Sequence, residues 1–128
     1  VDFPSLPEVS TGWDALSGAP LSEPLSVCLV TAEVVGPVNN GGIGTAYATL
    51  ASSLVAAGHR VTVLFTMGPV SQHGPFEDWV KSYAERGIEL VGLYRPQIRY
   101  IPRHMLESYE VLRFLRKRTF DVIHVHDY

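Results

Sequence analysis

The sequence has almost no cysteine, no long run of one charge and no long apolar stretch. Cys28 is the only cysteine and lies in an apolar segment, so we predict a small buried thiol of a cytoplasmic, reducing compartment. No segment reaches the roughly 20 apolar residues of a membrane span, and no charged start followed by an apolar stretch marks a signal peptide. With a net charge of −3 and no basic run, nucleic acid and membrane surfaces are not expected partners.

Proline is concentrated at the start of the chain. Residues 1–24 contain four prolines and two glycines without sustained hydrophobic periodicity, which is typical of a linker or N-terminal arm. Residues 25–128 then form one domain in this interpretation. The chain begins without Met and stops directly after a strand-like segment, so we expect a domain that is incomplete at its C-terminus.

Apolar strand-like runs alternate with amphipathic stretches along the rest of the chain. We predict strands at 25–32, 61–65, 88–93 and 122–125, and helices at 45–57, 75–86 and 102–118. In the first helix, Ala46, Leu50 and Leu54 recur at a spacing of four and predict the buried stripe. This alternation predicts an α/β fold, a partial Rossmann-like parallel sheet of order 3-2-1-4 with helices on both faces. Ligands of such sheets bind where the chain reverses direction, here between the first and fourth strands.

A glycine-rich turn precedes the first predicted helix. Gly41, Gly42 and Gly44 can expose backbone N–H groups at the helix start to a phosphate or a sugar hydroxyl. A flexible turn that only needs left-handed torsions explains the same residues equally well. A dinucleotide fingerprint fits poorly because Tyr47 stands where its third glycine is required, and a Walker loop is excluded because no Gly-Lys-Ser/Thr occurs.

Two histidines alternate along the last predicted strand. The side chains of His124 and His126 therefore point to one face, and His126, at the carboxyl end, could reach a ligand. His124 is more simply a hydrogen-bonded core residue, and Asp127 a cap of the following turn. His-x-His with an acid also resembles a zinc site, but the residue usual between the second His and the Asp is missing, so no metal is expected.

These two segments together resemble a known family. Residues 31–33 (Thr-Ala-Glu), 41–44 (Gly-Gly-Ile-Gly), 58–61 (Gly-His-Arg-Val) and 120–128 (Phe-Asp-Val-Ile-His-Val-His-Asp-Tyr) are similar to the opening of glycogen and starch synthases and related retaining glycosyltransferases of the GT-B fold. The chain then corresponds to the first half of their N-terminal, acceptor-side domain. The middle of the chain matches only in the order of its elements.

The resemblance implies transfer of a glycosyl group, glucosyl by analogy, from a nucleotide-sugar to a carbohydrate or other acceptor with retention. It makes His126 the catalytic candidate at the transferred sugar. Asn39, Gly41, Gly42 and Gly44 are the candidate donor-phosphate loop, with Asn39 where the synthases have Lys, and candidate sugar or acceptor contacts are Glu33, His124 and Asp127. No cofactor is implied because the nucleotide-sugar is a substrate.

Alternatives remain open at this point. A nucleotide-binding Rossmann or flavodoxin-like module and a GT-B sugar-nucleotide epimerase fit the same order of elements. In the family, a second domain supplies most donor contacts, so we expect this chain alone to be inactive. The outer edge of the fourth strand has no predicted neighbour, and an open edge favours association with a second copy.

Overall fold

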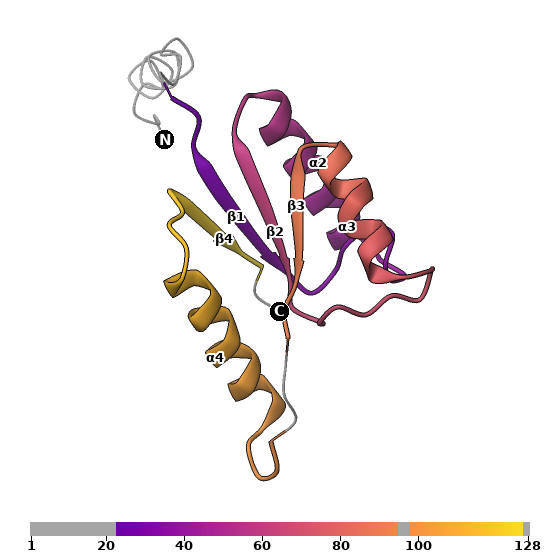
Figure 1. The fold of residues 1–128 in the computed structure, drawn as a ribbon, viewed down its shortest axis with the longest axis vertical. Coiled ribbons are helices and arrows are strands. Elements are labelled where there is room, and N and C mark those ends of the chain that lie inside the picture. Colours follow the sequence, from indigo (N-terminus) through magenta and orange to yellow (C-terminus); the bar gives the residue numbers. More distant parts are fainter. Residues whose placement is uncertain (1–22, 95–97, 127–128) are drawn as a thin grey trace, which may run out of the picture.

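Four parallel strands and three helices alternate along the part of the chain that the structure describes. A computed structural model describes residues 23–94 and 98–126. The elements are β1 (Ser26–Thr31), α2 (Gly42–Ala56), β2 (Arg60–Phe65), α3 (Phe76–Glu85), β3 (Ile88–Gly92), α4 (Arg103–Arg116) and β4 (Val122–Val125). The sheet has the order β3-β2-β1-β4, as predicted (Figure 1). Of the predicted N-terminal arm, residues 1–22 lie outside the described residues.

The helices cover both faces of the sheet, which confirms the predicted architecture. In Figure 1, α2 and α3 lie together on one face and α4 lies on the other. β1 is central and pairs in parallel with β2 and β4, with Val27 opposite both Val61 and Val122. A strand buried on both faces needs apolar side chains at successive positions. The burial of β1 from Val27 to Thr31 meets this requirement.

The two faces carry cores of unequal size. On the α2–α3 face, a large cluster of buried residues includes Leu29, Val63 and Phe65. On the α4 face, the fully buried members are Cys28, Val30, Leu64 and Leu93, and α4 contributes only partly buried side chains. α4 has no buried residue at all. The second face is therefore covered thinly.

An ion pair ties the C-terminal end of α4 to β3. The guanidinium of Arg118 donates to both carboxylate oxygens of Glu89, at 2.6 and 2.7 Å, and it lies 5.3 Å from the ring centres of Phe114 and Phe120. The hydrogen bonds from Arg118 lower the pKa of Glu89 despite its partial burial. This contact lies near the amino ends of the strands, away from the rim where the ligand is expected.

The predicted first helix differs from α2 in two respects. α2 begins at Gly42, so two of the turn's glycines belong to its first turn. The predicted buried stripe is wrong, because Ala46 and Leu50 are exposed and Leu54 is only half-buried. The buried residues of α2 are Gly44, Tyr47 and Ala51, since small side chains let the helix lie close to the sheet and Tyr47 fills the space beside β4.

Candidate functional site

The glycine turn and the histidine segment meet at one rim of the sheet. β1 and β4 run in parallel with Val30 opposite Val125, and the N–H of His126 donates to the carbonyl of Val30 at 3.1 Å. The ring of Tyr47, on α2, makes edge contacts with the rings of His124 and His126, with centroids 5.5 and 5.8 Å apart. No pattern in the sequence predicts this contact of Tyr47 with the two histidines.

The start of α2 is capped by a carboxylate from within the chain. One oxygen of Glu33 accepts hydrogen bonds from the N–H groups of Gly41, at 3.1 Å, and Gly44, at 3.2 Å. The hydroxyl of Thr31 donates to the carbonyl of Glu33 and accepts from its N–H, which fixes the turn directly after β1. A carboxylate at this position also interacts favourably with the helix dipole. The predicted sugar or acceptor contact of Glu33 stays untested, but its carboxylate has this role in the turn.

Two backbone N–H groups at the same helix start have no acceptor within the described structure. Gly42 and Ile43 are exposed, and neither N–H has an acceptor among the residues that the structure describes. The first N–H groups of a helix have no intrahelical partner and are satisfied by side chains, water or ligands. This pair of N–H groups is the part of the turn that an external anion could contact.

The three glycines of the turn are present for different reasons. None of the three has a positive φ, and the glycines of the described chain that do have one lie elsewhere. The explanation by left-handed torsions is therefore wrong. Gly44 is needed for space, since an added Cβ would lie 2.7 Å from the Cβ of Asn40. At Gly42 an added Cβ would meet nothing within 4 Å. No contact within the described structure requires a glycine at that position.

Asn39 is engaged with the loop between β2 and α3. Its side-chain oxygen lies 2.9 Å from Nε2 of His73, and its N–H donates to Gln72 at 3.0 Å. The carbonyl of His73 in turn accepts from the indole N–H of Trp79. Nothing in the sequence pattern pointed to His73 and Gln72 as neighbours of this loop.

The two histidines differ in exposure. His126 is half-buried at the end of β4, whereas His124 is exposed. The interpretation of His124 as a core residue is therefore wrong, since β4 is an edge strand of the described sheet and the ring of His124 lies on Tyr47 at the surface. Asp127 lies outside the described residues.

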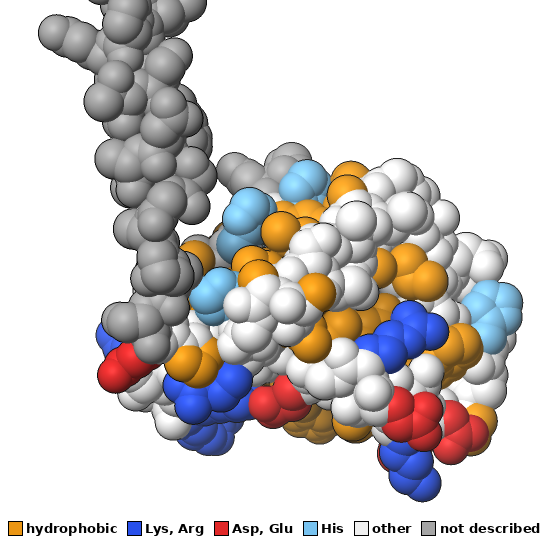
Figure 2. All heavy atoms as spheres, turned by 90° about the horizontal axis from the view of Figure 1, so that it is seen from above, with side chains coloured by type: hydrophobic (Ala, Val, Ile, Leu, Met, Phe, Trp, Pro, Cys, Tyr) orange, Lys and Arg blue, Asp and Glu red, His pale blue; other side chains and the backbone are white. Residues whose placement is uncertain are grey.

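Charged side chains are unevenly distributed over the surface. Figure 2, which views the molecule from above, shows most charged side chains along the lower side of the view, with histidine and hydrophobic side chains reaching the surface elsewhere. The exposed apolar residues include Val122, Ile123 and Val125 of β4.

The comparison with protein families decides the class. A family model described as Glycosyltransferase Family 4 matches residues 40–128, which include most of the glycine turn, all of α2 and the histidine segment. The chain belongs to glycosyltransferase family 4. The match and the parallel sheet of order β3-β2-β1-β4 together confirm the resemblance to the N-terminal domain of a GT-B glycosyltransferase. No curated protein matches the chain.

Metal-binding clusters and membrane-spanning helices are both absent from the described residues of this glycosyltransferase chain. In the described ranges 23–94 and 98–126, no group of three or more His, Cys, Asp or Glu residues is arranged to bind a metal ion. No described helix is long and apolar enough to cross a bilayer.

Proposed function

We propose that this chain binds the diphosphate of a nucleotide-sugar at the first turn of α2 and holds the transferred sugar beside His126. The single observation that carries the proposal is that the N–H groups of Gly42 and Ile43, two exposed residues on the same rim as His126, have no acceptor among the described residues. Backbone N–H groups at a helix start, with the partial positive charge of the helix dipole, suit phosphate oxygens. The nucleotide-sugar is the substrate, so the proposal includes no cofactor.

The neighbouring charges make donor binding by this chain weak. The carboxylate of Glu33 already accepts from the N–H groups of Gly41 and Gly44, and its negative charge opposes a diphosphate. Asn39 stands where the resemblance places a Lys, and an amide can donate a hydrogen bond but supplies no positive charge. Neutralising the departing diphosphate must therefore depend on groups outside this turn.

The finer parts of the proposal follow from the resemblance to glycogen and starch synthases. They are transfer of a glucosyl group with retention of configuration, to a carbohydrate or other acceptor, in the cytoplasm. The basic diphosphate contacts belong to a second domain in that family, so we expect no product when this chain alone is incubated with UDP-glucose or ADP-glucose. Formation of a glucosylated acceptor in that assay would contradict this expectation.

Titration of the ¹⁵N-labelled chain with UDP and ADP tests the donor site. We expect millimolar binding, with chemical-shift changes confined to residues 41–45 and His126. The Gly42→Ala variant should fold normally, because a Cβ there meets nothing within 4 Å, yet the methyl group shields the adjacent N–H groups. We expect its affinity for UDP to fall about fivefold, equivalent to about 1 kcal/mol.

Ser52→Ala, at an exposed α2 position, is the matched control and should bind UDP as the parent chain does. The proposal fails if the shift changes lie away from the rim, if Gly42→Ala binds UDP unchanged, or if neither nucleotide produces a change at 41–45.

A further inference from the structure

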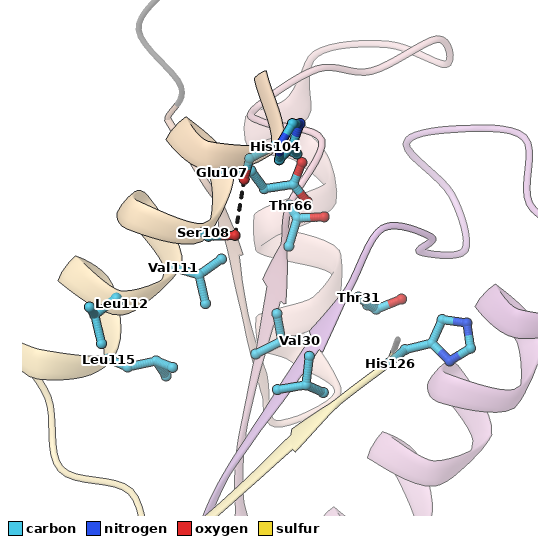
Figure 3. Close-up of a pocket in the computed structure, with 11 residues that line it drawn as sticks. Val30, Thr31, Thr66, His104, Glu107, Ser108, Val111, Leu112, Leu115 and His126 are labelled. Atoms are coloured by element: carbon cyan, nitrogen blue, oxygen red, sulfur yellow. Dashed lines mark hydrogen bonds between the residues drawn. The ribbon is translucent and has the colours of Figure 1, made fainter. Parts of the chain in front are cut away.

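A cavity of about 360 Å³ lies between α4 and the sheet, at the carboxyl ends of the strands (Figure 3). It is on the face of the sheet opposite α2, and most of the residues that line it lie outside the site described above. Thr31 and His126 border its side toward the rim, but the ring of His126 points away from the cavity, toward Tyr47 of α2 (Figure 3). The cavity therefore adjoins the place where the proposed donor sugar would lie.

The rim end of the cavity is polar. His104, Glu107 and Ser108 come from the first two turns of α4, and in Figure 3 they lie opposite Thr66, which follows β2. The hydroxyl of Ser108 donates to the carbonyl of His104 at 2.9 Å. This end of the cavity is therefore lined by hydroxyl, imidazole and carboxylate groups.

Thr66 supplies an independent indication of a ligand. Its side chain lines the cavity, and the residue is only 3% exposed. Among the described residues, its hydroxyl is the buried side-chain group without a hydrogen-bond partner. Buried polar groups in native proteins are satisfied in the great majority of cases, so an orphaned hydroxyl in a cavity wall indicates a missing partner.

The other end of the cavity is aliphatic. Val111, Leu112 and Leu115 continue the same face of α4, and Val30 and Val125 face them from β1 and β4. The spacing of these residues along α4 produces a gradient, with polar groups near the helix start and aliphatic groups two turns later. An occupant must match both ends.

We propose that this cavity binds the acceptor and that the acceptor is a small amphipathic alcohol, a polar hydroxyl-bearing head joined to an apolar body. The inference rests on the proposed function, because it takes His126 and the glycine turn as the donor side. The head lies at Thr66 and the start of α4, with its reactive hydroxyl toward the rim where β4 ends at His126, and the apolar body lies against Val111 and Leu115.

The proposed step transfers the sugar from the nucleoside diphosphate to the hydroxyl of the acceptor. The acceptor oxygen forms a bond to the anomeric carbon of the donor sugar, and the bond from that carbon to the diphosphate oxygen breaks. The nucleoside diphosphate leaves with the electron pair of that bond. The proton of the acceptor hydroxyl passes to the leaving phosphate oxygen or to solvent.

A glucan acceptor fits the cavity poorly. Every ring of a glucan carries hydroxyl groups, and burying them against aliphatic side chains without partners is unfavourable. A volume of about 360 Å³ is at the lower end of the range for small-molecule sites. The cavity therefore suits one compact body, and the proposal separates this chain from the synthases on acceptor class.

Three probes that share a glucose head test the acceptor class. The ¹⁵N-labelled chain is titrated with phenyl β-D-glucopyranoside, methyl β-D-glucopyranoside and maltotriose. We expect phenyl glucoside to shift the signals of Thr66, Ser108 and Val111, and to bind about tenfold more tightly than methyl glucoside because its ring is buried against aliphatic side chains. Maltotriose should leave these signals unchanged. Equal or tighter binding of maltotriose or methyl glucoside overturns the proposal.

Two substitutions in the cavity lining, with one control outside it, test the binding site. Ser108→Trp, at an exposed helix position, fills the cavity and should abolish phenyl glucoside binding, whereas Tyr109→Trp, one residue further and outside the lining, should not. Thr66→Val removes the orphaned hydroxyl at nearly constant shape, so it should weaken phenyl glucoside binding about threefold without lowering the melting temperature. Unchanged affinity in Ser108→Trp or Thr66→Val contradicts the assignment.

A UDP titration of the same sample separates the two proposals. Phenyl glucoside binding in the cavity without any effect of UDP at residues 41–45 removes the donor site and leaves an amphipathic-ligand cavity. UDP binding at 41–45 without phenyl glucoside binding leaves the donor site and rejects the acceptor class.

Discussion

Glu33 lies at the start of α2, where an external anion would otherwise find four backbone donors. Its carboxylate takes the N–H groups of Gly41 and Gly44 and leaves those of Gly42 and Ile43. The residue thus orders the turn and limits its charge at the same time. A donor phosphate that approaches this helix meets two open donors beside a fixed negative charge.

Cys28 is the other residue whose surroundings determine its chemistry. It is fully buried on the α4 face, and burial raises the pKa of its thiol from 9.0 to about 11. At pH 8 its thiolate fraction is therefore about two orders of magnitude below that of an ordinary thiol, and thiolate is the reactive form. We expect iodoacetamide to modify the native chain at least about a hundredfold more slowly than the urea-unfolded chain.

The contribution of the Cys28 thiol to stability depends on pH. Because folding raises the pKa of Cys28, its thiol contributes stability that is fully present below the unfolded pKa near 9. This contribution is lost as the pH rises to about 11. The native alkylation rate should thus rise most steeply above pH 9. Equal rates for native and unfolded chain at pH 8, measured by mass spectrometry, would contradict the burial of Cys28.

At the scale of elements, α3 holds the segment that joins β1 to α2. The hydroxyl of Tyr83 donates to the carbonyl of Val35 at 2.6 Å, and Gly36 lies against the ring of Trp79. Gly36 has φ of 112°, and an added Cβ would be 2.6 Å from that ring. The position of the glycine turn therefore depends on a helix that contributes no residue to it.

Gly36→Ala tests this dependence. We expect a loss of about 2–3 kcal/mol in the free energy of unfolding, from the torsion and the clash together, and altered NMR signals at residues 41–45. Gly58→Ala is the matched control, because Gly58 has φ of 92° but open space around it. It should lose only about 1 kcal/mol. Similar losses in urea unfolding for both variants would show that Trp79 does not constrain the segment.

The sequence predicted elements better than it predicted contacts between them. Apolar runs and glycine or proline at their ends were sufficient for the four strands, their order and the meeting of the glycine turn with His126. The buried stripe of α2 was predicted from aliphatic spacing alone, and it failed because Gly44 and Ala51 are buried for close approach rather than for hydrophobicity. The contact between Asn39 and His73 joins residues 34 positions apart, and no local pattern encodes it.

At the scale of the whole molecule, the edge position of β4 in the described sheet has a consequence for association. β4 is the edge strand beside β1, and Val122, Ile123 and Val125 are exposed on it. An edge with unpaired backbone groups and apolar side chains is a template for another strand. We therefore propose that two copies associate through β4.

Light scattering over a concentration series tests the association. We expect the average mass to rise toward that of a dimer at high concentration, and Ile123→Lys to keep the chain monomeric, because a charge on an edge strand opposes pairing. Lys81→Arg on α3 is a control that should leave the mass unchanged. A parent chain that stays monomeric at all concentrations rejects the proposal.

The attachment of α4 at one end has a consequence for the cavity. Arg118 and Glu89 fix the C-terminal end of this helix to β3, while His104 and Ser108 border the cavity near its other end. A small tilt of the helix about that fixed point changes the spacing at the far end most and the ion pair least. Under the acceptor proposal, such a tilt would change the width of the polar end of the cavity and leave the strands and the donor turn in place.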